Sequence, residues 1–215
     1  MRRRGLALVL LAWAGLAAAA DKPVGITADL PWLDVVHQGK VVRIQREPDN
    51  YGQIDPDFAL TSRPCPPFCI QPMHIAPGVE TIGEIEVLDA LKRASQPDDS
   101  VLVVDSREED WLARSGIIPG AVHVPWTRLH PAHTDPEAIA ATLQLLFGVA
   151  KSGPLWNFES ARTLVLYCNG PWCGQSPTNI KHLLLLGYPA HKLKWYRGGM
   201  QSWKSLGLTT VPVAK

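Results

Sequence analysis

The sequence has no marked excess of charge of either sign, no internal repeat and no low-complexity segment. Its 21 Lys and Arg residues nearly balance 20 Asp and Glu residues among 215, and 46% of the residues are hydrophobic. This balance argues against an acidic disordered tail and against a basic protein that binds nucleic acid. The length is sufficient for one sizeable core or for two small ones.

Long apolar runs are also missing, apart from one at the N-terminus. Residues 2–4 are all arginine and precede an apolar run over 6–20 that ends in four alanines. This arrangement is typical of a secretory signal peptide. A membrane anchor is the alternative, although the run is shorter than the roughly 20 residues that a spanning helix needs. We predict that residues 1–20 are cleaved near Ala20, leaving a soluble protein without stable membrane insertion, exported to a bacterial periplasm.

Cysteine is scarce, with two close pairs, Cys65/Cys69 and Cys168/Cys173. Thiols in an oxidising compartment form disulfides unless their chemistry or a reductant keeps them free. Four cysteines allow three pairings, and the sequence does not choose among them. Cys65 and Cys69 are the disulfide candidates. A metal site that also uses His74 is the alternative, disfavoured because these thiols should oxidise first.

Residues 21–80 are rich in proline and differ from the rest of the chain. Short apolar runs flank Gln38-Gly39-Lys40, a pattern typical of a β-hairpin. Prolines then recur from 48 to 77, which predicts an extended path over the surface and argues against helix or central strand. We therefore predict an N-terminal extension that packs on the main domain and is held by a Cys65–Cys69 disulfide.

Residues 81–210 alternate between short apolar runs and amphipathic segments. Strands are expected at 101–104, 164–167 and 193–196, with a further short apolar piece at 121–124, and helices at 84–93, 136–147, 179–186 and 200–206. Such alternation predicts an α/β fold, a single domain whose parallel sheet carries helices on both faces.

Two predicted strands end in residues that carry chemistry. The strand at 101–104 leads into Asp105-Ser106-Arg107, and the strand at 164–167 leads directly into Cys168. Ligands of open parallel sheets bind beyond the carboxyl ends of the strands. The loop after Cys168 is rich in glycine and proline and consists of Asn169, Gly170, Pro171, Trp172, Cys173, Gly174, Gln175 and Ser176.

This loop leads into a predicted helix, with Ser176 expected as its cap and Pro177 in its first turn. Backbone N–H groups of the loop and the positive end of the helix favour a thiolate over a thiol. A cysteine in such a setting has a pKa between roughly 3.5 and 7.5 instead of about 8.5. We predict that Cys168 is a nucleophile; a buried structural thiol or a plain disulfide is the alternative.

Three motifs, in the same order along the chain, resemble the rhodanese family of sulfurtransferases. The segments 105–111 (DSREEDW) and 118–125 (IPGAVHVP) are similar to the family's first signature. Cys168 resembles its active-site cysteine, and 196–203 (YRGGMQSW) resembles its closing Gly-Gly-x-x-x-Trp element. The resemblance extends over 81–208 and therefore leaves the proline-rich extension outside.

The resemblance implies sulfur transfer in two steps, without metal or organic cofactor. The Cys168 thiolate takes a sulfane sulfur from thiosulfate, a persulfide or a polysulfide, and the Cys168 persulfide then passes it to cyanide or a thiol. Backbone N–H groups of the loop would hold the charge of the persulfide. The same resemblance implies that Asp105 and Arg107 brace the fold near the site. The expected partners are a small sulfur donor and a thiol acceptor.

The loop departs from the family's common Cys-x-x-Gly-x-Arg/Lys-Ser pattern. Seven residues separate Cys168 from Ser176, and none of them is basic. A loop without a cation is poorly suited to a doubly charged donor, so a persulfide or polysulfide of lower charge fits better than thiosulfate. Phosphoryl transfer needs an arginine that binds the phosphate oxygens. The Cys-x5-Arg pattern places this arginine at position 174, which is a glycine here, so the sequence argues against a phosphatase.

Cys173 is the second departure. One hypothesis is a resolving thiol that attacks the Cys168 persulfide and expels sulfide, or that forms a reversible disulfide with Cys168. A small buried side chain is the plain alternative. The segment 172–176 (WCGQS) also resembles a thioredoxin site without its last cysteine, which would make the protein an exported thiol–disulfide exchanger using Cys173. A rhodanese-like binding module without turnover is a third interpretation.

Overall fold

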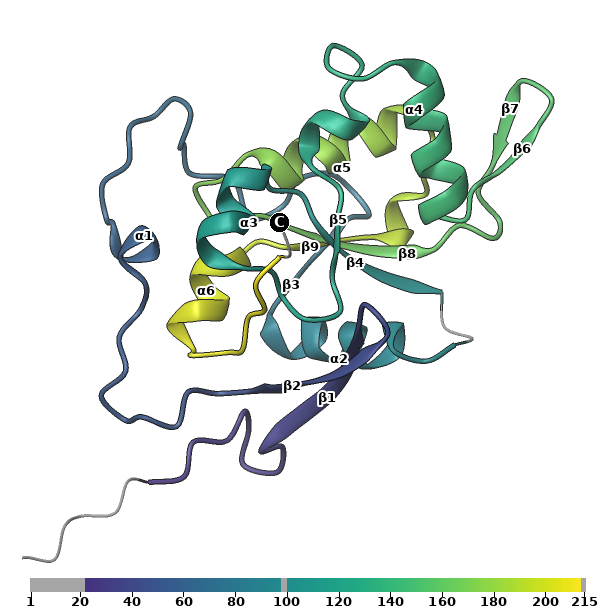
Figure 1. Cartoon of the computed structure of the whole chain (residues 1–215). Coiled ribbons are helices and arrows are strands. Elements are labelled where there is room, and N and C mark those ends of the chain that lie inside the picture. Colours follow the sequence, from purple (N-terminus) through teal and green to yellow (C-terminus); the bar gives the residue numbers. More distant parts are fainter. Residues whose placement is uncertain (1–21, 98–99, 214–215) are drawn as a thin grey trace, which may run out of the picture.

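The computed structural model describes residues 22–97 and 100–213 (Figure 1). The predicted signal peptide, residues 1–20, lies outside this part of the chain. Within the described ranges, no helix has both the length and the hydrophobicity needed to cross a membrane. The structure consists of a central sheet, helices on both of its faces, and an N-terminal extension that runs along the outside (Figure 1).

Five short strands form the central sheet in the order β3-β9-β8-β4-β5, and all neighbouring strands are parallel. In chain order they are β3 (Glu80–Ile82), β4 (Val101–Asp105), β5 (Val122–His123), β8 (Thr163–Tyr167) and β9 (Leu193–Tyr196). The central strands β4 and β8 are apolar along almost their whole length because helices cover both faces. The parallel α/β fold predicted from the alternating pattern is confirmed.

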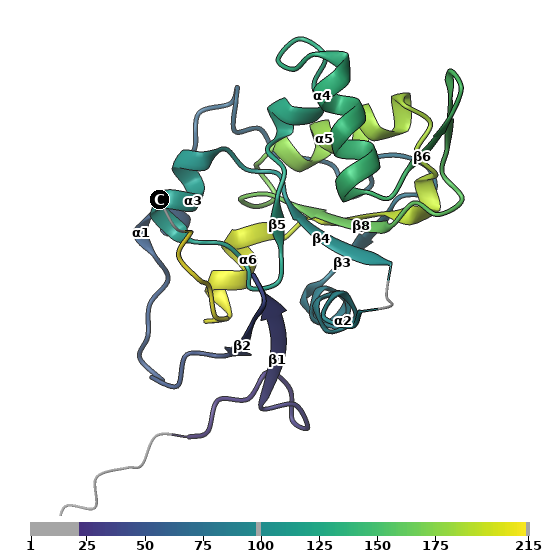
Figure 2. The same cartoon turned by 45° about the vertical axis from the view of Figure 1, so that its right-hand side comes forward.

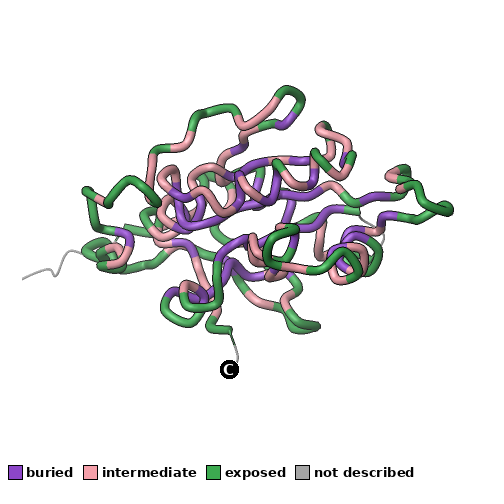
Figure 3. Tube along the Cα trace, turned by 90° about the horizontal axis from the view of Figure 1, so that it is seen from above, coloured by how far each residue is buried: buried purple, intermediate pink, exposed green. Residues whose placement is uncertain are grey.

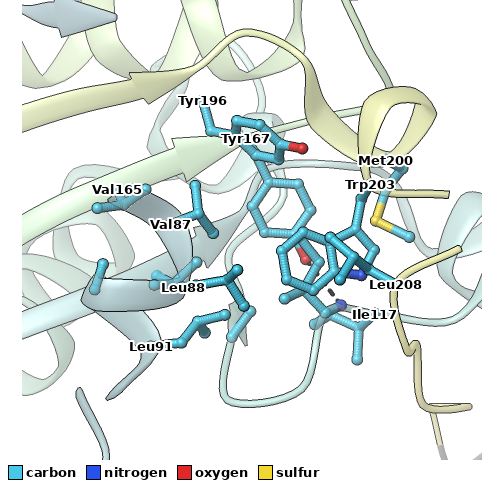
Figure 4. Close-up of a cluster of buried hydrophobic side chains, with 14 of the residues drawn as sticks. Val87, Leu88, Leu91, Ile117, Val165, Tyr167, Tyr196, Met200, Trp203 and Leu208 are labelled. Atoms are coloured by element: carbon cyan, nitrogen blue, oxygen red, sulfur yellow. Dashed lines mark hydrogen bonds between the residues drawn. The ribbon is translucent and has the colours of Figure 1, made fainter. Parts of the chain in front are cut away.

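Helices pack on both faces of this sheet (Figure 2). One face carries α2 (Glu84–Ala94) and α6 (Gly199–Ser205), and the other carries α4 (Pro136–Ala141), the π-helical turn Thr142–Leu146 and α5 (Gln175–Leu185). Side chains of the strands alternate between the two cores, so Val165 packs with α2 and α6 whereas Leu166 packs with α4 and α5. Figure 4 shows the first of these cores, where Val165 faces Val87 and Leu88 of α2.

The N-terminal extension contains the predicted hairpin, formed by β1 (Trp32–His37) and β2 (Lys40–Gln45). Val35 and Ile44 from the hairpin are buried in the same core as α2, so the extension shares the core of the domain. Most of the remaining extension is exposed or only partly buried. Figure 3 shows that the buried stretches of the chain gather in the middle of the molecule. The proline-rich part includes one short helix, α1 (Pro56–Ala59), where the pattern predicts none, because Pro56 occupies the first turn, in which a helix tolerates proline.

Several element bounds differ from the predicted ones. The helix predicted at 136–147 is divided into α4 and the π-helical turn, and α5 begins four residues earlier than predicted, at Gln175. The sequence reasoning missed the hairpin of β6 (Ala150–Ser152) and β7 (Leu155–Asn157), whose residues lie largely at the surface and lack an apolar run. The remaining helical elements are α3 (Glu109–Ser115) and 3₁₀ turns at Trp126–Leu129 and Ala190–Lys192.

Candidate active site

The candidate site lies at the carboxyl ends of the neighbouring strands β4 and β8. Asp105 at the end of β4 is in register with Tyr167 at the end of β8, and Cys168 follows immediately. The loop 169–174 then turns back and leads into α5. Parallel pairing therefore brings the two chemistry-bearing strand ends of the sequence to one edge of the sheet.

Hydrogen-bond donors surround the sulfur of Cys168. The Ser176 hydroxyl donates to Cys168 Sγ at 3.1 Å. Burial alone would raise the pKa of the Cys168 thiol, but hydrogen bonds from the Cys173 thiol, from the Ser176 hydroxyl and from the backbone N–H groups of Ser176 and Gly170 lower it below its usual value. In the neutral form, the Cys168 thiol donates to the Cys173 carbonyl oxygen at 3.3 Å. The loop therefore favours a thiolate at Cys168.

Cys173 has the opposite electrostatic setting. Burial raises its pKa well above the usual value, and the hydrogen bond to Cys168 and the negative charge there raise it further. When Cys168 is neutral, the Cys173 thiol donates instead to the side-chain oxygen of Gln175, at 3.6 Å. The loop therefore favours ionisation of Cys168 and disfavours ionisation of Cys173, and both cysteines are outside any disulfide.

An open pocket of about 690 Å³ lies against this loop. Its loop-derived lining includes Cys173 together with Asn169, Gly174 and Gln175. Cys168 does not line the pocket and is only 2% exposed. In this conformation, the sulfur of the predicted nucleophile is therefore not reachable from the pocket. Cys168 lies behind the loop because the loop residues whose N–H groups reach the sulfur also cover it.

Ser176 has a different role from the predicted one. Helix α5 begins at Gln175 with Gly174 at its N-cap, so Ser176 is inside the first turn and does not cap the helix. Its fully buried hydroxyl accepts a hydrogen bond from Trp195 Nε1 at 3.1 Å while it donates to Cys168. Ser176 thus connects the core to the sulfur, and Trp195 fixes the direction in which the hydroxyl proton points.

The start of α6 supports the loop from the other side. Backbone N–H groups of Met200 and Gln201 donate to the carbonyls of Cys168 and Asn169, at 2.9 and 2.8 Å. Gly199 has a φ of +54°, and a Cβ built on it would lie 2.2 Å from the Cys168 carbonyl oxygen. Glycine is required here for both reasons, which explains the Gly-Gly element of the closing motif in physical terms.

Asp105 and Arg107 form a fully buried ion pair, with Arg107 Nη2 2.6 Å from Asp105 Oδ2. Arg107 also donates to the Ser115 hydroxyl and to the Gly116 carbonyl, and the Tyr167 hydroxyl donates to Asp105. These contacts tie β4, β8 and α3 together beneath the loop. Neither charged group lines the pocket, which agrees with a bracing role. Tyr167 belongs to this network, but in the sequence it reads only as the last residue of an apolar strand.

The N-terminal extension forms one wall of the pocket. Cys65 and Cys69 are joined in a disulfide, so their sulfurs are not free for the alternative metal site. Phe68 packs edge-on against the loop residue Trp172, and the Arg63 guanidinium stacks over the same ring, with Cζ 3.8 Å from its centroid. Sequence reasoning did not single out Arg63 or Phe68, because only the folded chain brings them next to the loop.

Gln201 and the histidines complete the surroundings of the site. Gln201 accepts from Trp172 Nε1 at 2.8 Å, a contact that no motif predicts. His130 and His133, which lie in a proline-containing loop, pack against Trp126. Across residues 22–97 and 100–213, no group of three His, Cys, Asp or Glu side chains is placed to hold a metal ion.

A model of the rhodanese-like domain matches residues 87–206, more than half of the chain. The chain belongs to the rhodanese-like domain family. The matched range of this rhodanese-like chain includes Cys168, its loop, the Asp105–Arg107 pair and Gly199, and it excludes the extension that forms the pocket wall. A search of the curated proteins found no match.

Two solved structures are similar to this rhodanese-like chain. One is a protein of unknown function from Rhodopseudomonas palustris, described as a possible tyrosine phosphatase; it is 19% identical and has a TM-score of 0.40, over 62% of this chain and 85% of that chain. The other is a protein from Bacillus halodurans, 19% identical with a TM-score of 0.39, over 58% of this chain and 70% of that chain. Likenesses of this size say nothing about activity.

Proposed function

We propose that this rhodanese-like protein is a sulfurtransferase that carries sulfane sulfur on Cys168. The observation that supports this most strongly is the convergence of donors on the Cys168 sulfur, which lowers the pKa of this thiol although the side chain is buried. The same donors can hold the negative charge of a persulfide, so the cradle suits both the attacking thiolate and the intermediate.

The proposed sulfur transfer needs neither a metal nor a redox cofactor. With thiosulfate as donor, the Cys168 thiolate attacks the outer sulfur, the S–S bond of the donor breaks, and sulfite leaves with the bonding electron pair. With a persulfide donor, the leaving group is the donor's thiolate. Cyanide then attacks the outer sulfur of the Cys168 persulfide, leaves as thiocyanate and restores the thiolate; a thiol acceptor leaves instead as a persulfide.

Cys173 is proposed as the resolving thiol of this site. Its thiol hydrogen-bonds to the Cys168 sulfur and lines the pocket, so it lies on the route between donor and nucleophile. When no acceptor is present, the sulfur of the Cys173 thiol attacks the inner sulfur of the Cys168 persulfide. The Cys168–Cys173 disulfide forms, the S–S bond of the persulfide breaks, and the Cys173 proton passes to the departing sulfur, which leaves as hydrosulfide. A dithiol reductant then returns both cysteines to thiols.

The two other interpretations have less support. A thiol–disulfide exchanger needs a reactive Cys173, whereas burial and the neighbouring thiolate raise the pKa of this thiol well above its usual value. A binding module without turnover has no need for the donors gathered at Cys168. Phosphoryl transfer is not proposed, because Gly174 stands in the loop position where an arginine is required.

Thiocyanate formation tests the proposal. Wild type, Cys168→Ser and Cys173→Ser are incubated with thiosulfate or polysulfide and with cyanide, after circular dichroism has shown that each variant is folded. We expect thiocyanate from wild type and from Cys173→Ser but none from Cys168→Ser. Turnover that survives in Cys168→Ser and is lost in Cys173→Ser would overturn the assignment of the nucleophile, and a folded but inactive wild type would support the binding module.

We also propose that residues 1–20 direct export to the periplasm. The Cys65–Cys69 disulfide supports this, because such bonds persist mainly in oxidising compartments. The test is N-terminal analysis of protein recovered from the periplasmic fraction of a bacterial host. A new N-terminus near residue 21 is expected, and full-length protein retained in the cytoplasm would contradict the proposal.

A further inference from the structure

We propose that Arg63 of the N-terminal extension is the anion-binding residue of the sulfur-donor site and that it selects donors carrying a single negative charge. The active-site loop contains no basic residue, so a cation for the donor has to come from elsewhere in the chain. Arg63 lies outside the rhodanese-like match at 87–206, and it lines the pocket beside the loop. This inference rests on the proposed sulfur transfer and names the substrate class of the same site.

The position of the Arg63 side chain is well defined. Its guanidinium lies between two rings, with Cζ 3.8 Å from the centroid of the Trp172 ring and 5.8 Å from that of Phe68. Its Nη2 donates to the backbone carbonyl of Asp57, while its Nε is buried and has no hydrogen-bond partner among the described residues. Nη1 makes no hydrogen bond among the described residues and is not fully buried, so it is the group of this fixed guanidinium to which a donor anion in the pocket can bind.

Arg63 is also electrostatically coupled to Cys173. Burial lowers its pKa, and the negative charges of Asp57 and of a Cys173 thiolate oppose that shift. The guanidinium is thus within electrostatic reach of the sulfur that lines the pocket. An anionic donor held by Arg63 would lie over the loop, next to the cysteine pair.

The other charged residues of the pocket wall are already paired. Arg114 makes ion pairs with Asp110 at 3.2 Å and with Asp57 at 3.7 Å. Glu108 accepts a hydrogen bond from Trp126 Nε1. Arg63 makes no ion pair within residues 22–97 and 100–213. Its guanidinium is therefore the cation of the pocket wall that is available to a ligand.

The charge balance of the pocket favours donors of low charge. Two arginines and three carboxylates line the pocket, so its net charge is negative. The parts of the pocket away from Arg63 therefore repel a doubly negative donor. Leu60, Phe68 and Trp111 provide an apolar surface beside the guanidinium. A monoanion with an apolar body, such as an organic thiosulfonate or an organic persulfide, matches this combination better than thiosulfate does.

The extension holds Arg63 firmly against the loop. The backbone N–H of Gln71 donates to the Pro171 carbonyl of the loop at 2.8 Å, and Arg197 donates to the carbonyl of Gln71 at 2.9 Å. Between Arg63 and Gln71, the Cys65–Cys69 disulfide closes a tight turn. The proline-rich segment thus acts as part of the donor site.

The test compares the kinetics of Arg63 variants with two donors. Arg63→Ala and Arg63→Lys are assayed with benzenethiosulfonate, a monoanion with an apolar ring, and with thiosulfate. We expect a rise in KM for benzenethiosulfonate of roughly tenfold to a hundredfold in Arg63→Ala, with kcat nearly unchanged and partial recovery in Arg63→Lys. The matched control is Arg43→Ala, since Arg43 belongs to the same extension and stacks on Trp32 away from the pocket. It should behave as wild type.

A second measurement does not depend on turnover. In a Cys173→Ser background, Cys168 is trapped with neutral methyl methanethiosulfonate and with its anionic sulfonatoethyl analogue. Replacing Arg63 by alanine should lower the ratio of anionic to neutral trapping rates by about tenfold and leave the neutral rate unchanged, which also shows that the fold is intact.

The outcomes separate the two proposals. An unchanged KM and an unchanged trapping ratio in Arg63→Ala would overturn the role of Arg63, whether or not the wild type transfers sulfur. A wild type that forms no thiocyanate but whose trapping ratio falls in Arg63→Ala would refute the sulfurtransferase and leave Arg63 as an anion-binding residue.

Discussion

The hydroxyl of Ser176 is expected to set the pKa of Cys168 more strongly than any other single side-chain atom outside the cysteine pair. It donates to the Cys168 sulfur at 3.1 Å from a fully buried position, and Trp195 Nε1 orients it. A hydrogen bond to a charged group contributes about 1.5–3 kcal/mol, and one pKa unit corresponds to about 1.4 kcal/mol. Ser176→Ala should therefore raise the pKa of Cys168 by about 1 to 2 units.

The assay is the rate of alkylation of Cys168 by iodoacetamide as a function of pH. Only the thiolate reacts, so in wild type the rate should rise with pH and level off with a midpoint below the value of about 8.5 that is usual for a thiol. In Ser176→Ala the midpoint should move upward, so that the rate at a pH below both midpoints falls roughly tenfold to a hundredfold while the plateau at high pH is retained.

Thr178→Ala is the matched control for this experiment. Thr178 lies in the same turn of α5, but its hydroxyl donates to the Gly174 carbonyl and not to the sulfur. Its replacement should leave the midpoint in place. A midpoint in Ser176→Ala equal to that of wild type would refute the reasoning that side-chain donors keep Cys168 ionised.

Three further predictions concern the support of the site. Gly199→Ala should abolish thiocyanate formation, since the new Cβ would lie 2.2 Å from the Cys168 carbonyl oxygen; activity above half of wild type would contradict this. Asp105→Asn should lower the free energy of unfolding by about 3–5 kcal/mol, because it leaves Arg107 buried without its counter-charge. A denaturant titration measures this loss. A loss below about 1 kcal/mol would argue against a bracing role of the Asp105–Arg107 pair. Cys173→Ser should stop hydrosulfide release from the persulfide form, measured without acceptor, and release at the wild-type rate would remove the resolving role.

The sequence predicts the parts of the fold that depend on local pattern. The apolar runs at 101–104 and 164–167 predict buried strands, and parallel pairing then brings Asp105 and Cys168 to one edge of the sheet. The motif at 196–203 predicts a supporting element, but not that Gly199 touches the Cys168 carbonyl. That contact depends on how closely α6 approaches the loop, which no local pattern encodes.

The missing parts depend on tertiary contacts. Ser176 has the spacing of a helix cap, yet α5 begins one residue before it, because Gly174 accepts the first hydrogen bond of the helix from Thr178. The burial of Cys168 could not be predicted either, since a loop that directs its amides toward a sulfur also covers that sulfur. Arg63 is more than one hundred residues away from the loop in sequence and reaches it only through the path of the proline-rich extension.

The most direct test of the account is the intact mass of the protein after incubation with polysulfide, followed by peptide mapping. We predict that Cys173→Ser gains the mass of one sulfur atom and that the extra sulfur maps to Cys168. Wild type should gain the same mass only at early times, before Cys173 displaces hydrosulfide and the Cys168–Cys173 disulfide forms. Cys168→Ser should gain nothing. A gain that persists in Cys168→Ser, or that maps to Cys173, would contradict the claim that the cradle at Cys168 carries the sulfur.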